Sequence, residues 1–212
     1  VLGMGGVVSG PGGLMAWLLN IPLFVHEQNS IVGLTNRILS RFATGVYVAF
    51  PQAAETISGA ECIGNPVREG LTRLEPPAKR LETRLESPLQ LLVIGGSLGA
   101  AALNRIVPQA LAWLEPGQRP LVRHQCGEKH LQACQQHYAD ARIDAEVVSF
   151  IDDMPAAYAW ADLVICRAGA LTIAELCAVG LGSLLIPFPY AVDNHQHHNA
   201  LFLEQHDAAQ VL

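Results

Sequence analysis

The sequence predicts a doubly wound α/β fold, in which helices cover both faces of a mainly parallel sheet. Short apolar runs rich in β-branched residues alternate with longer segments that have the apolar spacing of helices. Half of the 212 residues are hydrophobic, so the chain is able to bury substantial cores. Alternation of this kind is typical of strands joined by helical crossovers, and two domains suit the length best.

The elements follow one another along the chain in a regular way. The predicted strands are residues 22–25, 45–49, 91–94, 121–124, 146–149, 163–166 and 183–186. The predicted helices are residues 100–114, 128–138, 171–179 and 194–205. The first of these helices has an apolar row made of Leu103, Ile106, Val107, Ala110 and Leu114. Because these residues recur every three or four positions, this helix is predicted to lay one face on a sheet.

The composition changes between residues 65 and 90, where prolines mix with charged side chains and no strand pattern occurs. Such a stretch is typical of a linker. We therefore predict a partial first domain at residues 1–65 and a second domain at residues 66–212. The chain opens on Val1 without an initiating methionine or signal peptide, and we expect it to be a piece of a longer protein.

Charge and cysteine content exclude several classes of protein. The net charge of −6 and the lack of a long basic run argue against binding to nucleic acid. The five cysteines form no C-x-x-C pair, so neither a disulfide framework nor a thiolate zinc site is predicted, and a reducing cytoplasm is expected. No apolar stretch reaches the roughly 20 residues of a spanning helix. Contact with a membrane surface is compatible with this sequence, but crossing is not expected.

Polar and glycine-rich segments follow the predicted strands. They are residues 26–29, 95–100, 150–153, 167–172 and 193–196. In an open parallel sheet, ligands bind outside the carboxyl ends of the strands. We therefore expect the segments of the second domain to share one edge of its sheet.

The glycine-rich turn at residues 95–100 suits a diphosphate, because bare backbone N–H groups and a helix N-terminus attract anions. The alternative is that its glycines only permit a tight turn. Residues 169–172 supply a second helix start with Glu175 one turn inside it, where a carboxylate is able to accept hydrogen bonds from two vicinal ribose hydroxyls. The alternative for Glu175 is a solvated helix residue. Residues 5–13 form a third glycine-rich turn before an apolar helix.

The histidines of the last predicted helix are not expected to form a metal site. His195, His197 and His198 do not share one helical face, and no carboxylate pair completes a shell. Gln196 and Asn199 lie three residues apart, so they suit joint hydrogen bonding to a sugar, although a polar outer face has the same spacing. No G-x-G-x-x-G motif follows a strand, which argues against a dehydrogenase.

Six motifs occur in the order found in one known family. They are GVVSGPGG at residues 6–13, HEQN at 26–29, GNPVR at 64–68, GGS at 95–97, FIDDM at 150–154 and RAGALT at 167–172. Over nearly its whole length the chain resembles the undecaprenyldiphospho-muramoylpentapeptide β-N-acetylglucosaminyltransferases. Six ordered motifs are far more specific than any single one.

The resemblance implies a GT-B type α/β architecture of two Rossmann-like domains facing across a cleft. In this chain the first would be incomplete and the second would lack its last helices. It implies a hexosyltransferase of peptidoglycan synthesis that moves N-acetylglucosamine, with inversion, from UDP-N-acetylglucosamine to the muramyl 4-hydroxyl of the undecaprenyl-diphosphate-linked muramyl-pentapeptide. The implied location is peripheral, at the cytoplasmic face of the plasma (inner) membrane. No cofactor or metal is implied.

The resemblance also assigns roles to residues of this sequence. The Ile151 backbone would read the uracil edge, Arg68 would lie near the nucleotide and Glu175 would hold the ribose. The diphosphate would contact Ser97 and the helix start, and the implied substrate-binding residues of that helix are Ala170, Leu171, Thr172, Ile173 and Ala174. Those implied to face the N-acetylglucosamine are Asn29, Gln196 and Asn199, and those of the acceptor-diphosphate loop are Gly10, Gly12 and Gly13.

The family's proposed catalytic base lies in a histidine-containing, glycine-rich loop that this sequence does not include. The catalytic residue is therefore left unknown, and the chain alone is expected to be inactive. Leu98 replaces the family's usual Gln, and Val7 replaces a frequent Tyr. Two alternatives stay open: another UDP-sugar enzyme, such as a diacylglycerol glycosyltransferase or a nucleotide-sugar epimerase, and a non-catalytic nucleotide-binding module.

Overall fold

The computed structural model describes residues 1–82, 84, 87–96, 99–189 and 194–212. Contacts within the chain separate two compact units. The first unit comprises Val1–Pro66, Gly169–Ala174 and Phe188–Asn199, and the second comprises Val67–Ala168, Glu175–Pro187 and Ala200–Leu212. The domain ranges 1–65 and 66–212 stay a prediction.

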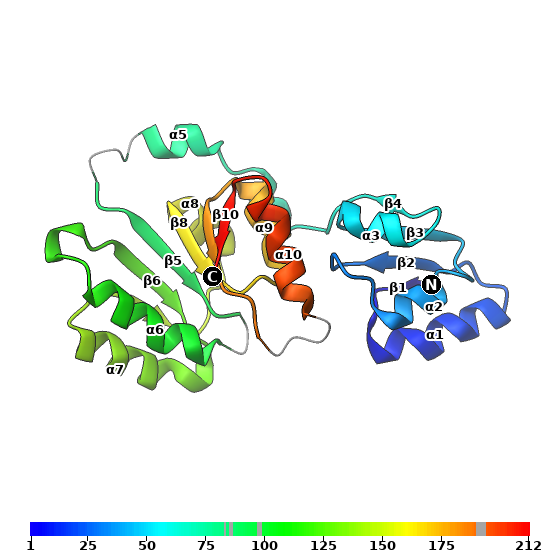
Figure 1. Ribbon diagram of the computed structural model, residues 1–212, viewed down its shortest axis with the longest axis horizontal. Coiled ribbons are helices and arrows are strands. Elements are labelled where there is room, and N and C mark those ends of the chain that lie inside the picture. Colours follow the sequence, from blue (N-terminus) through cyan, green and yellow to red (C-terminus); the bar gives the residue numbers. More distant parts are fainter. Residues whose placement is uncertain (83, 85–86, 97–98, 190–193) are drawn as a thin grey trace. The chain divides into compact units, whose positions relative to one another are not determined.

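Strands and helices alternate along the described residues, as the sequence predicts (Figure 1). The strands are β1 Leu2–Gly3, β2 Phe24–Glu27, β3 Gly45–Val48, β4 Glu61–Cys62, β5 Gln90–Ile94, β6 Leu121–Gln125, β7 Glu146–Val148, β8 Leu163–Cys166, β9 Ser183–Leu185 and β10 Ala209–Val211. The α-helices are α1 Gly6–Leu18, α2 Leu34–Leu39, α3 Pro51–Thr56, α4 Glu69–Thr72, α5 Pro77–Glu82, α6 Ala101–Ala112, α7 Leu131–Ala141, α8 Met154–Trp160, α9 Ala170–Val179 and α10 His195–Glu204. Short 3₁₀ turns lie at Pro116–Gln118 and Glu128–His130.

The first unit contains a parallel sheet in the order β1-β2-β3-β4. Its core is an aliphatic cluster that includes Val25 and Val48, both fully buried, and Leu39 of α2. Gly13 of α1 lies against Leu39, and a Cβ at Gly13 would approach that side chain to 2.7 Å. The run at residues 5–13, expected as a turn, is helical from Gly6 onward, and Gly13 permits close packing of α1 on α2.

The sheet of the second unit has the order β10-β9-β8-β5-β6-β7, and all its pairs are parallel. Numbered from β5, this is the order 3-2-1-4-5-6 of dinucleotide-binding folds. The direction of winding reverses between β5 and β8, and ligands of such sheets bind outside the strand ends at that point. The predicted parallel α/β fold is confirmed.

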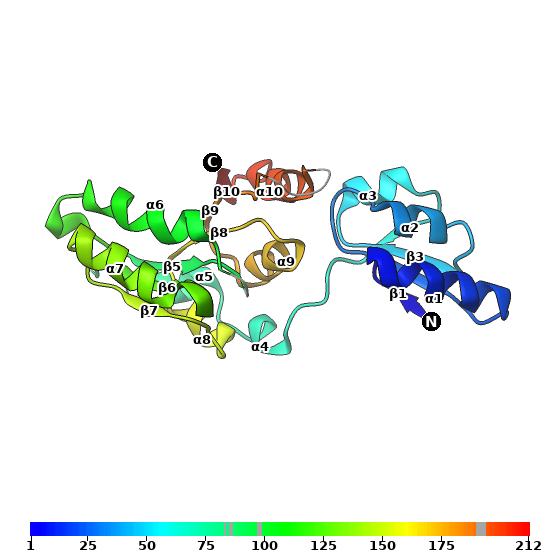
Figure 2. The ribbon, with the colours of Figure 1, turned by 90° about the horizontal axis from the view of Figure 1, so that it is seen from below.

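Helices α6 and α7 pack side by side on one face of this sheet (Figures 1 and 2). Leu91 and Val93 of β5 point into their core, which Tyr138 of α7 also joins. The buried face of α6 is formed by Leu103, Asn104, Val107, Pro108 and Leu111. The predicted apolar row is thus partly wrong, because Ile106 is 48% exposed while the polar Asn104 is buried.

The stretch predicted as a linker contains two helices, α4 and α5, rather than only open chain. Pro77 is the first residue of α5, where a missing N–H costs no hydrogen bond. Two arginines of this region, Arg80 and Arg84, bind the last turns of helices in the second unit. The segment is therefore tied to that unit: Pro77 begins a helix, and Arg80 and Arg84 anchor the segment.

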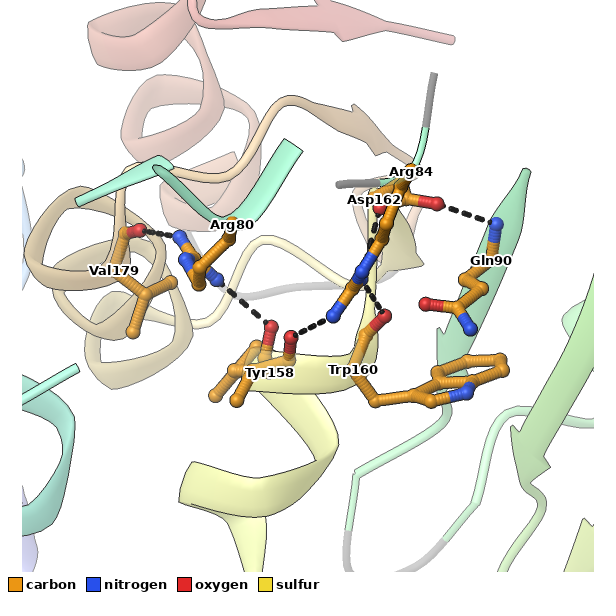
Figure 3. A network of polar contacts seen from close by, with 8 residues as sticks. Arg80, Arg84, Gln90, Tyr158, Trp160, Asp162 and Val179 are labelled. Atoms are coloured by element: carbon orange, nitrogen blue, oxygen red, sulfur yellow. Dashed lines mark hydrogen bonds and ion pairs between the residues drawn. The ribbon is translucent and has the colours of Figure 1, made fainter. Parts of the chain in front are cut away.

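Figure 3 shows this arginine clamp, defined by Arg80, Arg84 and Asp162. Arg80 donates to the Tyr158 carbonyl at 3.1 Å and to the Val179 carbonyl. Arg84 donates to the carbonyls of Trp160 at 2.5 Å and Ala159 at 2.9 Å, and to Asp162 Oδ1 at 3.0 Å. Asp162 Oδ2 accepts from the Gln90 amide at 2.8 Å. The guanidinium groups thus satisfy carbonyls that the ends of α8 and α9 leave without helical partners.

Candidate functional site

The carboxyl ends of β5, β6, β7 and β8 are neighbouring strand ends of the second unit, and they define the edge that we call the rim. Gly95 and Gly96 follow β5, and Arg167 follows β8. Arg167 donates to the carbonyls of Ile186 at 2.9 Å and Pro187 at 3.0 Å, which ties the loop after β8 to the loop after β9. Because the strands are parallel, these segments lie at one edge of the sheet, as predicted.

The glycines of the β5 turn have different surroundings. A Cβ at Gly95 would lie 2.8 Å from the Ala100 nitrogen, and one at Gly99 would lie 2.1 Å from the Cys126 carbonyl oxygen. Packing alone therefore explains these two glycines. Gly96 differs, because it is exposed and has a φ of +79°, and no described residue lies within 4 Å of the place where a Cβ would stand. Among the described residues of this turn, its bare backbone is the part that an anion is able to approach.

Gln125, at the carboxyl end of β6, holds the rim together, and the sequence reasoning missed it. Its side chain is 4% exposed, and its Nε2 donates to the carbonyls of Gly96 and Ser149, each at 3.0 Å. One amide thus joins the turn after β5 to the loop after β7. The place of Gln125 directly after the predicted strand at residues 121–124, where ligands of a parallel sheet bind, was the available signal.

The loop after β7 carries Ile151, which is half-buried. Asp153 caps the helix that follows, since its Oδ1 accepts from the Ala156 amide at 2.9 Å. The cap fixes the path by which the chain leaves Ile151 and enters α8. It therefore supports the backbone segment that the resemblance assigns to the nucleotide base.

Glu175 lies in a small polar cluster with Tyr158 and Arg68. The Tyr158 hydroxyl donates to Glu175 Oε2 at 3.0 Å, and Arg68 Nε lies 3.9 Å from Glu175 Oε1. The Glu175 side chain is only 15% exposed, whereas Arg68 is 58% exposed. Glu175 is thus no solvated helix residue, and the structure brings together two residues that the sequence analysis singled out.

Ala170, Leu171, Thr172, Ile173 and Ala174 form the first half of α9. The Ile173 amide donates to the Gly169 carbonyl at 2.9 Å, which is the start of the intrahelical ladder. The amides of the three preceding helical residues are those that a helix start leaves without intrahelical acceptors. This is the backbone arrangement that the predicted anion site requires.

Asn29 and Asn199 meet within the first unit. Asn199 is fully buried; its Nδ2 donates to Asn29 Oδ1 at 3.2 Å, and its Oδ1 accepts from Ser30 N and Oγ, both at 2.9 Å. Buried Glu27 orders the same loop by accepting from the Asn29 amide at 3.0 Å. Gln196 Oε1 accepts from the Phe188 amide at 2.8 Å. The alternative of a polar outer face is wrong for Asn199.

The remaining predicted residues are placed as follows. Gly10, Gly12 and Gly13 lie inside α1. Ser97 and Leu98 lie outside the described residues. Among the residues that the structure describes, no three metal-ligating side chains gather into a possible metal site.

Comparison with protein families gives two matches. Residues 90–212 match the model described as the glycosyltransferase family 28 C-terminal domain, and residues 1–48 match that of the glycosyltransferase family 28 N-terminal domain. A protein of Nitrosospira multiformis is 56% identical over 100% of this chain and 59% of its own length. One of Marinobacter nauticus is 53% identical over 99% of this chain and 57% of its own length. Both are named "UDP-N-acetylglucosamine--N-acetylmuramyl-(pentapeptide) pyrophosphoryl-undecaprenol N-acetylglucosamine transferase".

Solved structures of glycosyltransferases have a similar fold. The crystal structure of Acinetobacter baumannii MurG superimposes with a TM-score of 0.84 and 43% identity, covering 100% of this chain and 59% of that one. A UDP-glucose:anthocyanidin 3-O-glucosyltransferase shares the fold alone, at 14% identity and a TM-score of 0.67, over 100% of this chain and 62% of that one. The chain thus spans somewhat under three fifths of the relatives' length. The GT-B type fold and the resemblance stated above are confirmed, and the chain belongs to glycosyltransferase family 28.

Proposed function

We propose that this chain carries the donor-nucleotide site of a hexosyltransferase of peptidoglycan synthesis. The whole protein would transfer N-acetylglucosamine, with inversion, from UDP-N-acetylglucosamine to the muramyl 4-hydroxyl of the undecaprenyl-diphosphate-linked muramyl-pentapeptide. Relatives that bear the corresponding name align with 99 to 100% of the chain at 53 to 56% identity. Identity at this level over the whole chain supports the proposal.

The single observation that carries the donor site is the Glu175 carboxylate. It is mostly shielded from water, beside the rim of a sheet whose strand order is that of nucleotide-binding folds. A carboxylate accepts hydrogen bonds only, and its two oxygens match the two vicinal hydroxyls of a ribose. Arg68, 3.9 Å away, supplies positive charge for the nucleotide.

The other donor contacts are assigned by backbone chemistry. The backbone at Ile151 reads the uracil edge, while Ser97, the Gly96 turn and the α9 start with Ala170, Leu171 and Thr172 take the diphosphate; Ile173 and Ala174 complete the site. Negative charge grows on the β-phosphate as UDP leaves. N–H groups and a helix N-terminus aimed at this oxygen stabilise the transition state.

The sugar and the acceptor use residues of the first unit. Asn29, Gln196 and Asn199 would face the N-acetylglucosamine, and Gly10 and Gly12 would approach the acceptor diphosphate, whereas Gly13 is buried against Leu39. The lipid-linked acceptor implies peripheral binding at the cytoplasmic face of the plasma membrane. Among the described residues, no helix combines the length and the apolar character that crossing a bilayer requires.

We further propose that the 212-residue chain alone transfers little or no sugar. A hydroxyl nucleophile needs a general base, and none of the residues assigned above has that role. A product assay with lipid-linked acceptor, run on this chain and on a full-length relative, measures the difference. Turnover by the chain equal to that of the relative would contradict the proposal.

Titration with UDP-N-acetylglucosamine tests the donor site. Glu175→Ala is expected to weaken binding by roughly 10- to 100-fold, because two charge-assisted hydrogen bonds to the ribose are lost. Glu146→Ala is the matched control, since Glu146 is an exposed carboxylate at the amino end of β7, away from the rim. Equal affinities of the wild-type and Glu175→Ala chains would remove the ribose assignment.

A further inference from the structure

Tyr158 is a buried polar residue without a role in the site described so far. Its side chain is fully buried, and its hydroxyl reaches Glu175 Oε2 at 3.0 Å. It lies on α8, the helix that begins directly after the Ile151 loop. Tyr158 thus connects the helix behind the proposed base-reading loop to the proposed ribose carboxylate.

A glutamate side chain has three rotatable bonds, so its carboxylate needs partners to keep one orientation. Among the residues that the structure describes, the two candidate partners of the Glu175 carboxylate are unequal. Arg68 is 58% exposed and lies 3.9 Å from Oε1, which makes a weak contact that water and salt compete with. The Tyr158 hydroxyl is buried and within hydrogen-bonding distance, so it has the larger influence on where the carboxylate points.

The direction of this hydrogen bond is also settled. Burial, and next the negative charge of Glu175, raise the pKa of Tyr158 far above its usual value. The phenol therefore stays protonated at neutral pH, and its O–H donates to the carboxylate. This single donor leaves the other lone pairs of Glu175 for a ligand, since an ionised carboxylate has about four acceptor positions.

We propose that Tyr158 is a positioning residue that holds the Glu175 carboxylate in the orientation that receives the vicinal hydroxyls of the donor ribose. This inference rests on the proposed function. It adds that the preference of the site for ribose over deoxyribose depends on a tyrosine that does not itself touch the nucleotide.

The test compares UDP with 2′-deoxy-UDP on the 212-residue chain by calorimetric titration. The wild-type chain is expected to bind UDP more tightly. Tyr158→Phe removes only the hydroxyl, and it is expected to weaken UDP binding by roughly three- to tenfold while changing 2′-deoxy-UDP binding much less. A merely structural role would weaken both nucleotides alike. Because the readout is a ratio of two affinities, a lower fraction of folded variant does not alter it.

Tyr138→Phe is the matched control. Tyr138 is also buried, at 3% exposure, and its hydroxyl bonds to His124 at 2.9 Å instead of to Glu175. This variant is expected to keep the wild-type ratio. If the wild-type chain discriminates and Tyr158→Phe discriminates equally well, the inference alone is overturned. If the wild-type chain binds both nucleotides equally, or binds neither, the proposed ribose contact is overturned and the inference with it.

Discussion

Replacing Arg84 by alanine is expected to lower the free energy of unfolding of the chain by about 3 kcal/mol. The change leaves the carbonyls of Ala159 and Trp160 without their guanidinium donor at the end of α8. It also removes the cation from Asp162, whose side chain is only 12% exposed. A mostly buried carboxylate without its partner is costly. Urea unfolding followed by circular dichroism measures the loss.

Lys79→Ala is the control for this experiment. Lys79 lies on the same helix as Arg80 and pairs with Glu75 at 3.3 Å, but both side chains are about two-thirds exposed. Such a pair contributes at most about 0.5 kcal/mol. If both variants lose the same small amount of unfolding free energy, the arginine clamp does not hold residues 65–90, the predicted linker, on the second unit.

Acidification from pH 7 to pH 4 is expected to cost the folded chain about 3 kcal/mol through His124 alone. His124 is fully buried, and burial lowers its pKa from 6.5 to about 4. Between these two values the unfolded chain binds a proton that the folded chain does not bind. Stability through this residue is therefore complete above pH 6.5, falls by about 2 kcal/mol by pH 5 and continues to fall toward pH 4.

The hydrogen bonds of His124 explain why it is neutral. Asn104 Nδ2 donates to the Cys126 carbonyl, so Asn104 Oδ1 is the acceptor for His124 Nε2 at 3.0 Å. His124 Nδ1 is left to accept from the Tyr138 hydroxyl at 2.9 Å. A second proton would break that bond. Nearby Cys134 does not titrate in this range, because burial raises its pKa to about 12.

His124→Gln keeps a polar side chain but cannot titrate, so it isolates this effect. Urea unfolding at pH 7, 5 and 4 is expected to show a stability loss about 3 kcal/mol smaller for the variant than for the wild-type chain. Parallel pH profiles for the two chains would contradict the assignment.

Strands could be predicted from the sequence where their local apolar pattern agrees with their buried position in the sheet. The strand at β8 has the predicted bounds, and the strand at β5 agrees within one residue, because buried parallel strands appear as short apolar runs. The strand at β6 also agrees within one residue. Two features were not predictable. Asn104 is buried because His124, twenty residues later, is its partner, and the ends of α8 and α9 need the distant Arg80 and Arg84. Such long-range polar partners leave no periodic signal.

The candidate site could likewise be predicted from the sequence only in part. Its location after the strand ends follows from the parallel topology, and Glu175 was identified by its place in a helix that follows a glycine-containing turn. Gln125 and Tyr158 were missed because each acts through other residues: Gln125 through two backbone carbonyls, and Tyr158 through Glu175. A side chain that orients another one is visible only in three dimensions.

We propose above that Glu175 of the second unit holds the ribose of a uridine nucleotide. A crystal structure of the chain with bound UDP measures this directly. We expect both ribose hydroxyls to donate to the Glu175 carboxylate while Tyr158 still donates to Oε2. UDP bound elsewhere, or bound with its ribose turned away from Glu175, would contradict the account.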